Sequence, residues 1–319
     1  MISLKTAFAS GAAVAALCLA LPAVAQEQRL PAPVAPVEIA EDAVISDPVV
    51  EASKGPALWK VSDEDTTIYL FGTVHSLPSD VDWYRGDLAN ALDESDELVT
   101  EIDTTPETII TMQQVIAEKA LLAEGTLRGM MDADQRAVYE GAMAKLGLPP
   151  GSFDAMEPWF AALMLSNIAL DKQGFSPEAG AEKVLEATFG DTKRRSALET
   201  IEFQMSIFDE LPLEAQMRFL LEGASEIDTL ADELQKMVDE WAVGDADNLA
   251  ALLNEAFAED PVLAERLLYS RNASWAVWID ERLNEPGNIF MAVGAGHLAG
   301  INSVQDLLAE RGIDTVRVQ

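Results

Sequence analysis

Residues 68–75 read Ile-Tyr-Leu-Phe-Gly-Thr-Val-His, and residues 289–297 read Ile-Phe-Met-Ala-Val-Gly-Ala-Gly-His. In both stretches an apolar run leads to a glycine, and a histidine follows three residues later. These two histidines, His75 and His297, are the only ones in the chain. Apolar runs of this length predict buried strands, and glycine allows a sharp turn where a strand ends. Because α/β folds place ligands at strand ends, both histidines are candidate site residues.

The composition limits the possible partners and the location. The chain has 55 acidic and 21 basic residues, a net charge of −34, and such a surface repels nucleic acid and anionic lipid. Residues 1–25 combine Lys5, an apolar stretch and Ala23-Val24-Ala25, which predicts a secretory signal peptide and a periplasmic or secreted protein with no membrane association after cleavage. A retained anchor is the alternative, although the apolar stretch is short for a span. Cleavage would also remove Cys18, the only cysteine.

The rest of the chain divides into a linker and a folded part. Residues 26–54 contain four prolines without a sustained hydrophobic period, which predicts a disordered linker. Residues 55–319 are enough for one large domain or two small ones with a substantial core, and no stretch within them approaches a transmembrane span.

The hydrophobic periodicity predicts strands separated by long helical segments. Strands are expected at 57–61, 66–72, 97–103, 195–199, 289–293 and 315–318; helices are expected at 81–92 and 300–311 and through most of 106–193 and 201–283. Asp132 and Ser176 are expected helix N-caps, and Gly244 an expected helix stop. The pattern predicts an α/β (α+β) fold, in which a small mixed sheet is built from distant segments with large helical insertions.

Two carboxylates follow predicted strands and are candidates to join the histidines. Glu101 follows Leu98-Val99-Thr100, and Glu199 follows a shorter segment of the same kind. Asp103 is expected on the same face as Glu101. Imidazoles with carboxylates suit zinc, manganese, cobalt or iron and would hold a water nucleophile. The alternative is that the histidines are satisfied core residues and the acids are exposed charges of an acidic chain.

A basic and an amide residue, Arg271 and Asn272, lie on a predicted helix. They could polarise a carbonyl or hold a substrate carboxylate, although a surface arginine paired with an acid is the alternative. Trp241, Trp275 and Trp278 are interpreted as packing residues. Ser-His-Asp catalysis is disfavoured because the chain has no Gly-x-Ser-x-Gly motif.

Several segments together resemble a known family in the same order along the chain. They are 57–61, 69–75, 158–159, 198–200, 271–276 and 293–300. Over roughly residues 56 to 319 the chain resembles the TraB/GumN family, which includes the Tiki-type metalloproteases.

The resemblance implies a fold related to the erythromycin-esterase and ChaN-like group, with a divalent metal held by paired Gly-x-x-His motifs and acidic residues. On that basis His75 and His297 match the motif histidines, and Glu101 matches the glutamate that ends the next strand. Glu199, Arg271 and Asn272 match further family positions. Glu182, in Gly180-Ala181-Glu182, is a weaker match to a pocket acid, because Ala181 stands where a larger aliphatic residue is usual.

The leading hypothesis is an exported metal-dependent hydrolase, in particular a peptidase, acting on a peptide or small-molecule substrate. His75, His297 and Glu101 are expected to bind a metal ion (manganese, cobalt or zinc), and Glu101 is also expected to activate the metal-bound water. Arg271 is expected to stabilise the oxyanion and Asn272 to orient the substrate. Glu199 is expected to support the residues that contact the metal or the substrate. Two alternatives remain open: a non-catalytic binder of a peptide or small ligand, and a histidine-mediated haem or iron carrier.

Overall fold

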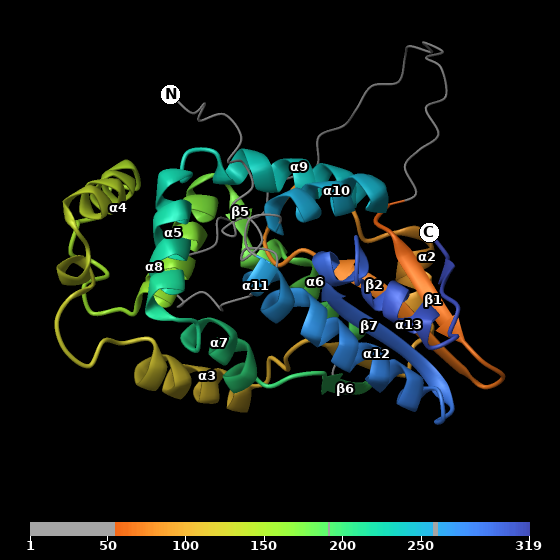
Figure 1. The fold of residues 1–319 in the computed structure, drawn as a ribbon. Helices are drawn as coiled ribbons and strands as arrows, with labels where there is room; N and C mark the ends of the chain where they lie inside the picture. The colour runs from red at the N-terminus through yellow and green to blue at the C-terminus, as the bar shows by residue number, and fades with distance from the viewer. Residues whose placement is uncertain (1–54, 191, 258–260) are drawn as a thin grey trace, which may run out of the picture.

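A six-stranded mixed sheet organises the fold (Figure 1). The computed structural model describes residues 55–190, 192–257 and 261–319, so the predicted signal peptide and linker lie outside the described residues. The strand order is β6 (Arg194–Ala197), β4 (Glu97–Thr100), β7 (Gly287–Gly294), β2 (Thr66–Thr73), β1 (Leu58–Ser62) and β8 (Val316–Arg317). The first four of these run parallel, whereas β1 is antiparallel to both of its neighbours. The predicted α/β fold with a small mixed sheet is confirmed.

The central strand, β7, is buried on both faces. Ile289, Met291 and Val293 point into one hydrophobic core, while Phe290 and Ala292 point into the other. Helices α12 (Ser270–Arg282) and α13 (Val304–Glu310) cover the first face, and the remaining helices lie on the second face and beyond the sheet (Figure 1). Two covered faces explain why this strand is continuously apolar rather than alternating.

The helices between the strands form the larger part of the molecule. They are α2 (Gly86–Glu94), α3 (Pro106–Lys119), α4 (Ala133–Lys145), α5 (Pro158–Lys172), α6 (Ala181–Phe189), α7 (Ile201–Asp209), α8 (Leu213–Ser225), α9 (Leu230–Val243), α10 (Ala246–Phe257) and α11 (Pro261–Ala264). Shorter pieces are the 3-10 helices η1 (Leu127–Met130), η2 (Pro177–Ala179) and η4 (Ala295–Leu298), the π-helical turn η3 (Glu265–Tyr269), and a small sheet of β3 (Leu77–Pro78) and β5 (Phe175–Ser176). None of the described helices is both long and apolar enough to cross a membrane.

Local signals in the sequence located several helix ends correctly. Asp132 and Gln135 form a reciprocal capping box at the start of α4. Ser176 caps the short helix η2, and Gly244 ends α9 with a left-handed φ of 78°. The predicted hairpin is also confirmed, since Leu58 of β1 pairs with Phe71 of β2.

Other boundaries differ from the prediction. The helix expected from Val81 begins at Gly86, because Trp83 is buried in an aromatic cluster and stacks on Phe71 with 5.7 Å between ring centroids. The helix expected from Gly300 begins at Val304, since the backbone at Gly300 and at Asn302 has positive φ.

Three predicted strands, β4, β6 and β8, are shorter than expected, and the segment from 106 to 193 is not wholly helical. β4 ends at Thr100 and β6 at Ala197, although hydrogen bonds from the amides of Leu198 and Glu199 to the carbonyls of Thr100 and Glu101 extend the pairing by two residues. Residues 120–132 and 146–157 form loops and the 3-10 helix η1.

Candidate functional site

Side chains from the ends of four parallel strands meet in the interior. His75 follows β2, His297 follows β7, Glu101 follows β4 and Glu199 follows β6. His75, Glu101 and His297 are 6 %, 5 % and 0 % exposed. Because the carboxyl ends of parallel strands lie at the same edge of a sheet, strand order brings together residues that are up to 222 positions apart.

Arg271 of α12 links the two carboxylates. Its Nε lies 2.9 Å from Glu199 Oε1, and its Nη2 lies 2.6 Å from Glu101 Oε2 and 2.9 Å from Glu199 Oε2. Its Nη1 donates to the carbonyl of Leu267 at 2.8 Å. Arg271 is only 2 % exposed, so its guanidinium is a buried cation between two buried anions.

Further donors complete the coordination of the carboxylates. Gly294 N donates to Glu101 Oε1 at 2.6 Å, and Gln204 Nε2 donates to Glu101 at 2.9 Å and to Glu199 at 3.1 Å. Trp275 Nε1 donates to Glu199 Oε1 at 3.1 Å. Both carboxylates therefore have hydrogen bonds on each oxygen, as buried anions require.

His297 is held on both ring nitrogens. Asn272 Nδ2 donates to the carbonyl of Asn302, so its Oδ1 faces His297 Nδ1 at 2.5 Å and accepts the Nδ1 proton. The Nε2 lone pair of His297 then accepts from Arg271 Nη1 at 3.1 Å. Burial, followed by the charges of Arg271 and His75, holds the pKa of His297 well below its usual range, so this imidazole is neutral.

His75 has a different environment despite its identical motif. Its Nδ1 lies 2.6 Å from Glu182 Oε1, an ion-pair contact without the alignment of a good hydrogen bond. Its Nε2 has no hydrogen-bond partner among the described residues. Burial is the largest single influence and would lower the pKa of His75, but the carboxylates of Glu182 and Glu101 together outweigh it, so the pKa of His75 is raised. Burial would likewise raise the pKa of Glu182, yet the charge of His75 lowers it.

Gly180 explains how this contact is positioned. A Cβ at this residue would lie 2.1 Å from the carbonyl oxygen of His75, so only glycine allows the start of α6 to pack against the histidine backbone. The amide of Ala181 donates to the carbonyl of Val74 at 2.9 Å. Glu182, in the first turn of α6, is therefore placed directly beside the ring of His75.

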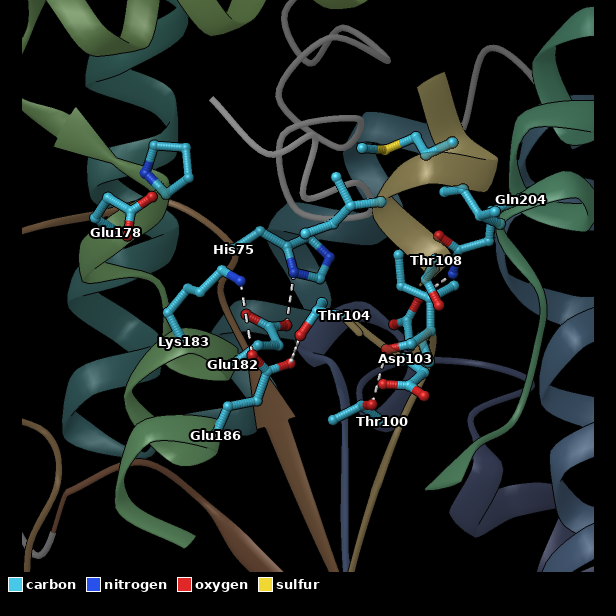
Figure 2. Close-up of a pocket in the computed structure, with 16 residues that line it drawn as sticks. His75, Thr100, Asp103, Thr104, Thr108, Glu178, Glu182, Lys183, Glu186 and Gln204 are labelled. Atoms are coloured by element: carbon cyan, nitrogen blue, oxygen red, sulfur yellow. Dashed lines mark hydrogen bonds and ion pairs between the residues drawn. The ribbon is translucent and has the colours of Figure 1, made fainter. Parts of the chain in front are cut away.

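A pocket opens next to His75 and contains about 850 Å³ of empty space, part of it open to solvent (Figure 2). The lining residues are His75, Thr100, Glu101, Ile102, Asp103, Thr104, Thr108, Ile109, Met112, Pro177, Glu178, Glu182, Lys183, Glu186, Ile201 and Gln204. Of the predicted site residues in the described structure, His75 and Glu101 reach this pocket. Arg271, Asn272, Glu199 and His297 lie behind it, in the buried network.

Sequence reasoning missed two participants of the network. Gln204 is a buried amide in the first helical turn after Thr200, where nothing in the local pattern distinguishes it from a surface glutamine. Trp275 was expected to pack only; it does pack on His297, with 4.2 Å between ring centroids, but it also binds Glu199. Asp103 lines the pocket with Glu101 as expected, although both residues follow the strand rather than belong to it.

The expected metal ligands can be tested against their contacts. A ligand must offer a free lone pair to the metal. In His297 both ring nitrogens are engaged, whereas Glu101 accepts three hydrogen bonds, one of them from a guanidinium, and keeps a lone pair on Oε1. Within 55–190, 192–257 and 261–319, no group of three or more His, Cys, Asp or Glu side chains could hold a metal ion. As arranged, His75, His297 and Glu101 do not fit a shared metal, and metal dependence stays a prediction.

Comparison with known protein families gives a match over most of the chain. The model of the TraB/PrgY/gumN family matches residues 57–317, a range that contains both Gly-x-x-His motifs and the whole buried network. No curated protein and no solved structure gives a significant match.

Proposed function

The chain belongs to the TraB/PrgY/gumN family, and from that membership and the site geometry we propose that it is an exported hydrolase of a peptide or another small-molecule substrate. One observation supports the hydrolytic part above all. His75 lines a pocket, and its Nε2 has no hydrogen-bond partner among the residues that the structure describes, while its Nδ1 lies against the Glu182 carboxylate. An imidazole oriented by a carboxylate is the arrangement that general acid–base catalysis requires.

In the proposed reaction His75 Nε2 removes a proton from a water molecule in the pocket. The water oxygen bonds to the substrate carbonyl carbon, and the bond to the leaving group breaks. His75 then returns the proton to the leaving group, so that protons balance over the cycle. Glu182 stabilises the imidazolium that exists between the two transfers.

The buried network has a positioning role in this proposal. Arg271 and Glu199 hold Glu101 at the inner wall of the pocket, and Asn272 holds His297. Because the donors of Arg271 point at Glu101, Glu199, His297 and the Leu267 carbonyl, we assign it to holding Glu101 rather than to stabilising an oxyanion. This assignment differs from the oxyanion and substrate-orienting roles that the sequence suggests for Arg271 and Asn272, which stay predictions.

The test uses the chain from residue 26, a peptide library and a panel of amide and ester substrates. We expect His75→Gln to lower kcat by roughly a hundredfold or more, which is the usual contribution of a general base. Glu182→Gln should lower kcat less. Glu140→Gln, a matched change on α4 in an ion pair with Arg128, should leave it unchanged.

Each assay is run after chelation and with added manganese, cobalt or zinc, so that the metal prediction is tested separately. Hydrolysis that needs one of these ions would restore the metal-dependent form of the hypothesis. Full activity of His75→Gln would refute the role of His75. A wild-type protein that binds peptides but leaves them intact under every metal condition would favour the non-catalytic binder, and a Soret band on haem titration would favour the haem carrier.

A further inference from the structure

We propose that the pocket beside His75 selects a substrate that carries a primary ammonium group next to an aliphatic side chain. This is the same pocket in which the proposed hydrolysis takes place. The selectivity for an ammonium group does not depend on hydrolysis; only the fate of the bound molecule rests on the proposed function. The selectivity follows from the division of the pocket into an acidic wall and an apolar wall.

The acidic wall is formed by η2 and α6. Glu178, Glu182 and Glu186 line it together with the cationic side chain of Lys183, and Figure 2 shows Glu182, Lys183 and Glu186 grouped below His75 with Glu178 farther out to the left. Lys183 Nζ lies 3.6 Å from Glu186 Oε2, and Thr104 Oγ1 donates to Glu186 Oε1 at 2.7 Å. The carboxylates of this wall therefore outnumber its cation, and Glu178 is solvent-exposed and accessible to a ligand.

The opposite wall is mainly apolar. Ile102, Ile109, Met112 and Ile201 come from the loop after β4 and from α3 and α7. Asp103 belongs to the same wall and adds a further negative charge at its edge. A ligand that spans the pocket can thus place a cation against α6 and an aliphatic group against α3 and α7.

The inner wall favours a cation as well. Behind Glu101 the buried network combines two carboxylates, those of Glu101 and Glu199, with one guanidinium, that of Arg271. His75 lies between the walls at 6 % exposure, with an Nε2 that lacks a hydrogen-bond partner among the described residues. This buried, unsatisfied nitrogen indicates that the pocket accommodates a polar ligand rather than only apolar groups.

The same features disfavour other ligand classes. An anion would meet five pocket carboxylates, those of Glu101, Asp103, Glu178, Glu182 and Glu186, of which three also contact the basic side chains of Arg271, His75 and Lys183, and a chain of net charge −34 would repel it at longer range. A divalent metal would need three donors in one group, which the described residues do not provide. A primary ammonium has three donors and can bind separate carboxylates without a fixed coordination geometry.

The proposal is tested by calorimetric measurement of the affinity of the protein for three probes whose C-terminus is amidated and so carries no negative charge. The probes are leucyl-leucinamide, N-acetyl-leucyl-leucinamide and N-acetyl-lysyl-leucinamide. We expect the ammonium-bearing probes to bind at least about tenfold more tightly than the acetylated leucyl probe, as expected for a charged hydrogen-bonded group. Comparison of the first and third probes identifies the source of the ammonium, a peptide N-terminus or a lysine side chain.

Two variants should act in opposite directions. Glu178→Gln should weaken binding of the ammonium probes roughly two- to fivefold, and Lys183→Gln should strengthen it by a similar factor, as expected for exposed ion pairs. Neither should change binding of the acetylated leucyl probe. Ile109→Ser, on the apolar wall, should weaken all three probes.

Equal binding of free and acetylated leucyl probes, no measurable binding of any probe, or shifts of the same sign in Glu178→Gln and Lys183→Gln would overturn the inference. These outcomes are distinct from failure of the proposed function. Ammonium-dependent binding without turnover would refute hydrolysis and support the selectivity, whereas equal turnover of free and acetylated peptides would support hydrolysis and refute the selectivity.

Discussion

Arg271→Ala should be among the most damaging single substitutions in the chain. The side chain is 1 % exposed and supplies charge-assisted hydrogen bonds to Glu101 and Glu199, whose side chains are 6 % and 7 % exposed. Its removal leaves two carboxylates in the interior with the remaining donors from Gly294, Gln204 and Trp275 but without a cation.

The size of the effect can be estimated by comparison with an exposed pair. Breaking a buried ion pair by deleting one partner costs about 3–5 kcal/mol, a large part of a typical unfolding free energy of about 5–15 kcal/mol. Arg311 binds Asp280 at a similar distance, 2.7 Å, but these side chains are 38 % and 43 % exposed. Arg311→Ala should therefore cost about 0–1 kcal/mol.

Urea denaturation, followed by tryptophan fluorescence and by circular dichroism, measures both variants on the chain from residue 26. We also expect Arg271→Ala to cost less in a Glu199→Gln background, because one of the two stranded charges is then absent. If Arg271→Ala cost no more than Arg311→Ala, the buried guanidinium would not be the element that stabilises the carboxylates, and the positioning role assigned to Arg271 would be refuted.

Three further perturbations can be measured with the same unfolding assay. Gly180→Ala places a Cβ 2.1 Å from the His75 carbonyl oxygen and should lower the free energy of unfolding by about 1–3 kcal/mol or more. The control Gly141→Ala, on α4 with open space around it, should raise the free energy of unfolding by about 0.5–1 kcal/mol. Equal effects of the two variants would contradict the steric argument. Trp275→Phe removes an N–H donor from a buried carboxylate but keeps an aromatic ring, and should cost about 1–3 kcal/mol; a neutral effect would show that the hydrogen bond is dispensable. For His75→Gln, the stability lost relative to wild type should depend on pH. Because the pKa of His75 is raised and that of Glu182 is lowered, the contact between them stabilises the fold fully between the ordinary values of the two groups, above pH 4.5 and below pH 6.5. The difference in unfolding free energy between wild type and His75→Gln should shrink as pH rises through the folded-state pKa of His75. A difference in unfolding free energy that does not change with pH would refute the ion pair.

The sequence predicted the strands well because their pattern is physically simple. A run such as Ile289–Val293 that is apolar without alternation fits a strand covered on both faces, and the structure has such a strand. Four of the six predicted strands are followed by a polar candidate residue, so the position of Glu101, Glu199 and both histidines at one edge of the sheet followed from the parallel arrangement of these strands.

The sequence could not distinguish the two histidines, since their local motifs are the same. The difference comes from side chains that reach them from distant helices: Glu182 of α6 contacts His75, and Asn272 of α12 contacts His297. Such contacts depend on how helices pack against the sheet, which periodicity does not specify. The helix expected from Val81 failed for a similar reason, because tertiary burial of Trp83 overrode local spacing.

The position of β7 has a consequence for the order of events during synthesis. This strand lies between β2 and β4, yet it begins 187 residues after β4 ends and is encoded in the last tenth or so of the chain. A nascent polypeptide that has produced β1, β2 and β4 cannot place them in their final arrangement, because the central strand has not yet been made. Pairing over such separations is slow relative to local helix formation. The amide of Gly294 that binds Glu101 arrives with the same strand, so the network assembles only when translation is almost complete. This topology would leave the incomplete polypeptide without a finished site until the last strand has been made.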